Sequence, residues 1–330
     1  MKQVVFHISE IAKYIHKAQK SHKLRNIFIG LIFFIGIFLL TPSKSFAATF
    51  VVDTTINDTV DIFPGDGICQ DMLFTCSLRA AIIEANNWAG ADIITLPDGQ
   101  YDLTLTGAGD DAAASGDLDI NQSLTINGGS SNNTVINGLG PMWDDRIFHI
   151  VSSGQQMDVI FNDFTISGGN LAAGNGGGIY ASEFTIATSN YDFNRLRVIN
   201  NSTGGLGGGI ACDIDANDIP ATGSSCNISR SEISGNTGSA GGGGLYIDAF
   251  SAIPGSFTGN ISNTTISGNT VPSGTGAGVY MGTTDSTGIF WNLVNNTIAN
   301  NSGIEIQTIL NGGAPNLVLN MGNHIIDNHT

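Results

Sequence analysis

The stretch "VINNSTGGLGGGIA" (Val198–Ala211) decides the fold, because both of its features recur along the chain. An aliphatic residue lies three places before Asn201, and a glycine run ends eight residues after it, at Gly209. A dinucleotide-binding loop would use such glycines once, as G-x-G-x-x-G between a strand and a helix. Here the third glycine of that pattern is missing and no helical pattern follows. We therefore interpret the run as a turn of a repeat.

The repeat is defined by asparagines that follow an aliphatic residue by three places. They are Asn201, Asn236, Asn269, Asn301 and Asn328, at intervals of 35, 33, 32 and 27 residues. Glycine turns keep the same period and end at Gly178, Gly209, Gly244 and Gly278. The last interval is shorter because its turn retains only Gly303, while its strand part keeps its length. Variable loops on constant strands are typical of a solenoid.

Short runs with alternating apolar residues, such as "IYASEFTIA" and "NRLRVINN", separate each glycine turn from the next asparagine. They are rich in β-branched residues and lack a helical period, so three short strands fit one interval. We predict an all-β chain folded as a right-handed parallel β-helix. Its core would be a column of aliphatic and aromatic side chains. Its asparagine amides would bond from coil to coil as a ladder.

One segment, "CSLRAAIIEANNWAG" (Cys76–Gly90), has a helical pattern instead. Its apolar residues fall on one face, Ser77 can cap its start and Gly90 can end it. A single amphipathic helix before a solenoid predicts a cap that covers the core and the strand edges of the first coil.

The first residues predict export. A run of 14 apolar residues, Ile27–Leu40, follows a basic leader and precedes "TPSKSFAA". This run is too short to span a membrane easily, and small residues at Ser45 and Ala47 are typical of a signal-peptide cleavage site. We expect cleavage after Ala47, or after Ala48, with an uncleaved anchor as the alternative. The predicted organisation is a signal peptide (1–47), a cap (48–90) and a β-helix (91–330).

The charge of the exported part excludes some partners. Residues 48–330 contain five Arg, no Lys and 27 Asp or Glu, a net charge of −22. Such a surface would repel nucleic acid and anionic lipid, because Lys and Arg supply most of the affinity for phosphates. We expect cations, sugars or other proteins as partners. No integral membrane segment is expected after signal cleavage.

All four cysteines lie in the exported part, as two pairs with short intervals. In an oxidising compartment we expect two local disulfides, Cys69–Cys76 and Cys212–Cys226. Zinc is the less favoured alternative, because neither pair has C-x2-C spacing and no histidine is near in sequence.

Catalysis is the second hypothesis, because parallel β-helices also serve as polysaccharide lyases and hydrolases. A lyase needs a basic residue, and Arg195 with Arg197 would share a face if both lay in one strand. A hydrolase needs two converging carboxylates. The adjacent pairs Asp110/Asp111 and Asp144/Asp145 would converge only if loops placed them. No catalytic residue is assigned from the sequence.

The segment "CDIDANDIPATGSSC" (Cys212–Cys226) is an acidic insertion with part of a calcium-loop motif. Asp213, Asp215 and Asn217 have the D-x-D-x-N spacing, so they are the candidate calcium ligands. Asp218 and Ser224 stand where the motif requires Gly and Glu. A solvated acidic loop is the alternative, and no other cofactor is expected.

At "DGIC" (66–69), "CSLR" (76–79) and "AN" (85–86), followed by the glycine and asparagine repeats, the chain resembles exported bacterial proteins named for a Cys-Ser-Leu-Arg-Glu-Ala motif. Their β-helical repeats are similar to those of polymorphic outer-membrane proteins. The resemblance covers residues 50–330 and departs at Ala80, where the motif has Glu. It implies a β-helix that is secreted or held at the cell surface or outer membrane, generally without an assigned reaction.

The sequence as a whole predicts an exported, non-catalytic β-helix that presents loops for adhesion to a host or cell-surface protein or a polysaccharide. A carbohydrate-active enzyme, either a polysaccharide lyase or a glycoside hydrolase, is the alternative. The last I-x-x-N line reaches Asn328 without a capping pattern. We therefore expect the β-helix to continue beyond residue 330, or to associate end to end.

Overall fold

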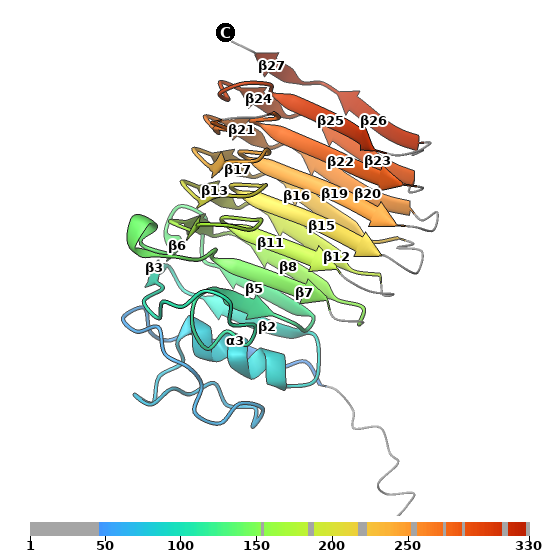
Figure 1. Cartoon of the computed structure of the whole chain (residues 1–330). Coiled ribbons are helices and arrows are strands. Elements are labelled where there is room, and N and C mark those ends of the chain that lie inside the picture. Colours follow the sequence, from blue (N-terminus) through green and yellow to red (C-terminus); the bar gives the residue numbers. More distant parts are fainter. Residues whose placement is uncertain are drawn as a thin grey trace, which may run out of the picture. The chain divides into compact units, whose positions relative to one another are not determined.

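The computed structural model describes residues 46–152, 155–183, 188–216, 223–251, 256–272, 275–285, 288–311 and 316–327. These residues belong to one compact unit, Phe46–Thr330, in which parallel strands coil into a right-handed β-helix (Figure 1). The predicted fold class is confirmed. No helix among the described residues has the length and apolar character to cross a membrane.

Three long parallel sheets and one short one form the sides of the β-helix. The first sheet consists of β1 (Thr49–Val51), β2 (Asp92–Leu96), β5 (Leu124–Gly128), β8 (Asp158–Asn162), β12 (Asn190–Asn194), β16 (Ser225–Ser229), β20 (Ser256–Ser262), β23 (Gly288–Val294) and β26 (Asn316–Gly322). The second consists of β3 (Gly99–Asp102), β6 (Thr134–Asn137), β9 (Thr165–Ser167), β13 (Arg197–Ile199), β17 (Glu232–Ser234), β21 (Thr265–Ser267), β24 (Thr297–Ala299) and β27 (Ile325–Asp327).

The third sheet carries the candidate site on its first strands. It consists of β4 (Leu118–Ile120), β7 (Phe148–Ser152), β11 (Ile179–Glu183), β15 (Ile210–Ala216), β19 (Leu245–Ser251), β22 (Val279–Asp285) and β25 (Ile306–Asn311). The short sheet consists of β10 (Asn170–Leu171), β14 (Ser202–Thr203) and β18 (Thr237–Gly238). One coil therefore has the three expected strands, such as β11, β12 and β13, and then a two-residue strand before the glycine turn.

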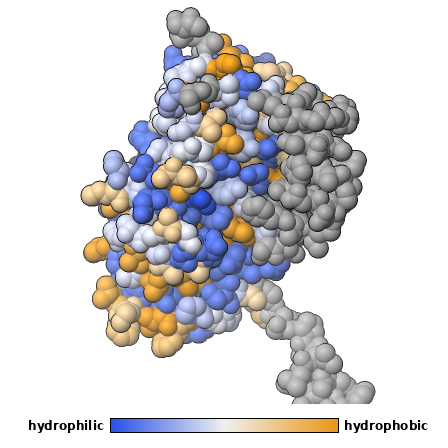
Figure 2. Space-filling view, in the orientation of Figure 1, coloured by the Kyte–Doolittle hydropathy of each residue, from blue (hydrophilic) through white to orange (hydrophobic). Residues whose placement is uncertain are grey.

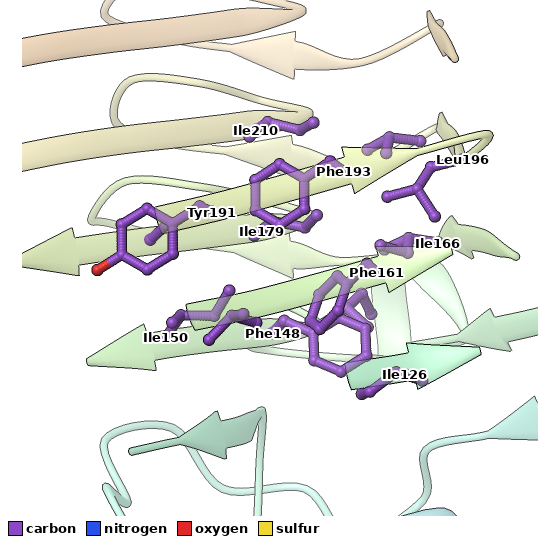
Figure 3. Close-up of a cluster of buried hydrophobic side chains, with 14 of the residues drawn as sticks. Ile126, Phe148, Ile150, Phe161, Ile166, Ile179, Tyr191, Phe193, Leu196 and Ile210 are labelled. Atoms are coloured by element: carbon purple, nitrogen blue, oxygen red, sulfur yellow. The ribbon is translucent and has the colours of Figure 1, made fainter. Parts of the chain in front are cut away.

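The core is a column of stacked side chains from equivalent positions (Figure 3). Phe161 of β8 pairs in register with Phe193 of β12, and their rings lie 5.5 Å apart. Phe148 and Phe164 pack on the same ring of Phe161, at 4.8 and 5.4 Å. All four side chains are fully buried. Alternation along each strand sends every second residue into this column, which is why the sequence period is two.

The glycine turns are required by the close stacking of coils. Gly178 N–H donates to Gly209 O at 3.0 Å, and Gly209 N–H donates to Gly244 O at 3.2 Å. A Cβ on Gly178 or Gly209 would lie 2.6 Å from the carbonyl oxygen of the next coil. Backbones that approach this closely leave no room for a side chain. These glycines form the repeat turn that the sequence predicts.

The buried asparagines form a ladder along the axis. Asn236 Oδ1 accepts from the backbone N–H and the Nδ2 of Asn201, at 3.0 and 3.1 Å. Asn269 and Asn301 repeat this arrangement in the next two coils. Each Nδ2 also donates to a carbonyl of the preceding coil, as Asn236 does to Val198 O at 2.9 Å. Asn328 lies outside the described residues.

The N-terminal segment covers the first coil. Helix α3 (Leu78–Asn87) begins at Ser77, whose hydroxyl accepts from Ala80 N–H at 3.1 Å, and it packs against β2 and β4. It ends at Asn87, three residues before Gly90, which has a φ of +153°. Strand β1 lies in the expected cap segment but pairs with β2, so the first sheet begins before residue 91.

Both predicted cysteine pairs are joined. Cys69–Cys76 closes a loop before α3, with the two Cα atoms 5.2 Å apart. Cys212–Cys226 links β15 to β16 within one coil, and both its side chains are buried in the core.

Candidate functional site

A pocket of about 350 Å³ opens beside β4 and β7, and four of its ten lining residues are aspartates. Three segments that are distant in sequence form it: the loop before β4, the loop before β7, and the residues at and after β10. The lining residues are Ala108, Gly109, Asp110, Asp111, Asp117, Asp145, Arg146, His149, Leu171 and Ala173. We call this site the acidic pocket.

Two buried carboxylates, Asp117 and Asp145, lie together on its wall. Asp145 Oδ2 accepts from the backbone N–H of Asp117 at 3.2 Å, and its Oδ1 accepts from Arg146 N–H at 2.8 Å. The Asp117 side chain is 4% exposed, and its one ion-pair partner among the described residues is Arg146 Nη1, at 3.6 Å. Gly116, with φ +63°, allows this approach, since a Cβ there would lie 2.5 Å from Asp145 Oδ2.

A histidine and an exposed carboxylate, His149 and Asp111, line another part of the pocket, and the buried Asp119 lies behind His149. His149 Nδ1 lies 3.2 Å from Asp119 Oδ1 and 4.0 Å from Asp111 Oδ1. Asp119 is buried and its Oδ2 accepts from Ala113 N–H at 2.8 Å, whereas the Asp111 side chain is 85% exposed. These three side chains offer ligand atoms within 4.8 Å of one another, a grouping that could hold a divalent cation.

Stacked rings hold the histidine in place. The His149 ring is nearly parallel to the Tyr180 ring, 5° apart in plane with centroids at 5.3 Å. The Arg146 guanidinium lies 5.1 Å from the same Tyr180 ring, and Tyr180 donates its hydroxyl proton to Asp213 Oδ2 at 3.2 Å. Equivalent outward positions of β7 and β11 bring the two rings together, because His149 and Tyr180 are in register.

The cap fixes the loop that carries Asp117. Arg79 of α3 donates to the carbonyl oxygens of Ala113 and Gly116 at 2.9 and 2.8 Å. It also forms an ion pair with Asp58, which accepts from the backbone N–H groups of Thr104 and Leu105. The Arg79 charge is therefore already balanced by Asp58, and the pocket carboxylates lie beside a neutralised pair.

The acidic pocket has more negative than positive charge. Burial and the neighbouring carboxylates of Asp119 and Asp145 raise the pKa of Asp117 to about 9, although Arg146 and Arg79 oppose the shift. Burial also raises the pKa of Asp145, against two backbone hydrogen bonds and Arg146. A protonated Asp117 can donate a proton or a hydrogen bond at neutral pH. Ionised neighbours can accept hydrogen bonds from hydroxyl or ammonium groups.

The structure shows where the carboxylate pairs named from the sequence lie. Asp111 and Asp145 reach the same pocket because loops place them, the condition that adjacent carboxylates needed. Asp110 also lines the pocket, but its side chain accepts from Ala112 and Ser115 N–H in its own turn. Asp144 is exposed and does not line the pocket.

The arginine pair expected to share a strand face is separated. Arg195 lies in a turn, with φ +53°, and Arg197 begins β13. Each has its own acidic partner: Arg195 pairs with Asp163 and Arg197 with Glu232. The two arginines therefore do not lie in one strand, which was the condition for a shared face, because the left-handed turn at Arg195 ends the strand alternation.

The candidate calcium ligands are only partly described. Asp213 and Asp215 belong to β15, which pairs with β11 and β19 on its two sides, so they lie in a strand. Asp213 accepts hydrogen bonds from Tyr180 and Asn175. Asn217 lies outside the described residues, and calcium binding there stays a prediction.

Sequence reasoning missed Asp117, Asp119, His149 and Tyr180. A signal for the first two was present in "GDLDI" (116–120), where carboxylates alternate with core residues at the start of a strand. Nothing in the sequence places His149 beside them, because the contact depends on the register of β4 with β7.

The chain matches no family model, no curated protein and no solved structure.

Proposed function

We propose that this chain is an exported β-helical surface protein that binds a neutral or cationic sugar residue of a glycan in the acidic pocket. One observation carries the proposal: Asp111, Asp117 and Asp145, from two loops, line one pocket together with His149. Carboxylates bind the hydroxyl groups of sugars as hydrogen-bond acceptors and attract ammonium groups of amino sugars. The surplus negative charge disfavours uronic acids and sulfated sugars.

Export is supported by four features. The N-terminal apolar run with Ser45 and Ala47 is typical of a signal peptide. Both disulfides suit an oxidising compartment. The resemblance to exported proteins with a Cys-Ser-Leu-Arg-Glu-Ala motif points the same way, and a chain without lysine after residue 47 suits an extracellular surface rather than a nucleic-acid partner.

A binding experiment with matched variants tests the proposal. The secreted protein would be titrated with neutral, amino-sugar and uronic-acid oligosaccharides, as would Asp145→Asn and Asp144→Asn. We expect binding of a neutral or amino sugar, at least about tenfold weaker in Asp145→Asn because a charged acceptor is lost. Asp144→Asn, one residue away and exposed, should bind normally. Preferential binding of uronic acids, or equal binding by both variants, would refute the pocket as the site.

Glycoside hydrolysis is the second candidate, favoured by the state of Asp117. A buried carboxyl group whose pKa is raised to about 9 stays protonated at neutral pH, as a general acid must. Asp145 or Asp111 would then activate water or attack the sugar. Release of reducing ends from a polysaccharide panel, abolished in Asp117→Asn but kept in Asp144→Asn, would establish catalysis over binding alone.

A further inference from the structure

A buried carboxylate at the start of the β-helix has an incomplete set of partners. Asp92, the first residue of β2, is fully buried. Its Oδ1 accepts from the backbone N–H of Ala48 at 2.6 Å, and its Oδ2 has no hydrogen-bond partner among the described residues. It forms no ion pair with any described residue. A buried carboxylate oxygen without a hydrogen-bond donor destabilises the folded state, so this site lacks a donor for Oδ2.

The nitrogen that reaches Asp92 is held there by strand pairing. Ala48 O accepts from Ile93 N–H at 2.9 Å, and Thr49 and Phe50 of β1 then pair with Ile93 and Ile94 of β2. The backbone hydrogen bonds between β1 and β2 therefore fix the position of Ala48 N. Ala47, on the other side of the Ala47–Ala48 peptide bond, is exposed.

The sequence independently marks the same peptide bond. Cleavage after Ala47 is the first of the two signal-peptidase positions expected from Ser45 and Ala47. Hydrolysis of this bond would release Ala47 as a carboxylate. The nitrogen of Ala48 would become an α-amino group, which takes up a proton at neutral pH.

We infer that signal-peptide cleavage between Ala47 and Ala48 creates an α-ammonium group that completes a buried ion pair with Asp92. The inference rests on the export proposed above. An ammonium has three donors where the amide has one, so it can satisfy Asp92 Oδ2 as well as Oδ1. It also supplies the positive charge that the site lacks. Signal-peptide cleavage would therefore strengthen the pairing of β1, the edge strand of the first sheet, with β2.

Register makes the pairing specific to one cleavage position. A strand advances about 3.3 Å per residue, so a new terminus one residue away would place its charge outside hydrogen-bond reach of Asp92. Under this inference, the product cleaved after Ala47 is more stable than the product cleaved after Ala48. Burial without a cation raises the pKa of Asp92 in the unprocessed chain, consistent with a carboxylate that awaits a positive partner.

The test uses the secreted protein and its single amine. Residues 48–330 contain no lysine, so an amine-reactive ester can label only the α-amino group. Its N-terminus would be sequenced and its labelling rate measured at pH 7. We expect Ala48 as the first residue and labelling at least about tenfold slower than in Asp92→Asn, because each unit of raised amine pKa lowers the reactive fraction tenfold.

A second variant keeps the inference testable if Asp92→Asn does not fold. Insertion of Gln-Thr between Ala47 and Ala48 keeps Ser45 and Ala47 as the cleavage site, creates no second small-residue site, and moves the amine two residues away from Asp92. This protein should label rapidly and unfold on the order of 5–10 °C lower than the unaltered protein. Asp144→Asn, an exposed carboxylate, is the control and should match the unaltered protein in both measurements.

The outcomes separate this inference from the proposed function. An uncleaved, cell-retained chain would contradict export itself. A secreted protein that begins at another residue, or whose amine labels as fast as that of the insertion variant, would overturn the ion pair and leave export intact. Equal destabilisation by Asp92→Asn with and without the Gln-Thr insertion would also overturn it, because Asp92 would then act only through a backbone amide.

Discussion

Arg79 and Asp58 form a fully buried ion pair, with Nε and Oδ1 2.6 Å apart, at the junction of the cap and the acidic pocket. The guanidinium uses its other donors for carbonyl oxygens of residues 113–117, the loop that brings Asp117 to the pocket. The arginine of the "CSLR" motif therefore connects the cap helix to the candidate site. Loss of the cap helix should therefore also disrupt the loop that forms the pocket.

Arg79→Lys should be strongly destabilising although it keeps the charge. Lysine cannot supply the fork of donors that Asp58 and three carbonyl oxygens use, and buried acceptors would lose their partners. We expect a loss of about 3–5 kcal/mol in the free energy of unfolding, measured by denaturant titration. Arg195→Lys is the matched control, because its pair with Asp163 is only half-buried and should contribute less than about 1 kcal/mol. Equal effects of the two changes would contradict this role of Arg79.

Asp117 should make stability fall as the pH rises. Its pKa is raised from 3.8 to about 9 by burial and by Asp119 and Asp145, so the folded state binds this proton more tightly than the unfolded state. The stabilisation is complete below pH 4 and is lost progressively up to about pH 9. Asp117→Asn removes the titration and should flatten the dependence of unfolding free energy on pH between 5 and 9. A slope unchanged from that of the parent protein would show that Asp117 is ionised in the folded state.

The inner asparagine ladder should contribute more to stability than the outer one. Asn269→Ala removes a buried amide that accepts from both Asn236 donors, and we expect a cost of about 2–4 kcal/mol. Asn260, in the same coil, belongs to a half-buried ladder with Asn227 and Asn292 on the outside. Asn260→Ala should cost less than about 1 kcal/mol. Thermal and denaturant unfolding of both variants decides the comparison, and similar losses would count against a special role for the inner ladder.

Intact-mass counting of free thiols tests the disulfides in the secreted protein. We expect none under non-reducing conditions, and a loss of about 2–3 kcal/mol in unfolding free energy when Cys212 and Cys226 are both replaced by Ala. Four reactive thiols would refute both bridges.

The repeating features of the fold could be predicted from the sequence. The period of Asn201, Asn236 and Asn269 is the coil length, and Gly209 is glycine because the next coil passes 2.6 Å from where its Cβ would be. The pocket could not be predicted in this way. His149 meets Asp119 through the pairing of β7 with β4, and Asp117 meets Asp145 through two loops of different length. Contacts made once, between irregular loops, have no signature in a single sequence.

Among the described residues, the asparagine ladder ends at a carboxylate, and its hydrogen bonds have one direction along the axis of the β-helix. Asn301, the last described member, donates its backbone N–H and its Nδ2 to the side chain of Glu305, which is buried. Between ladder members, each Oδ1 accepts from the preceding coil and each Nδ2 donates to the following one, so these hydrogen bonds all point the same way along the axis. The chain of donors runs perpendicular to the strands and ends on the Glu305 carboxylate. The ladder is therefore polar, with its acceptor end toward the N-terminal cap and its donor end at Glu305.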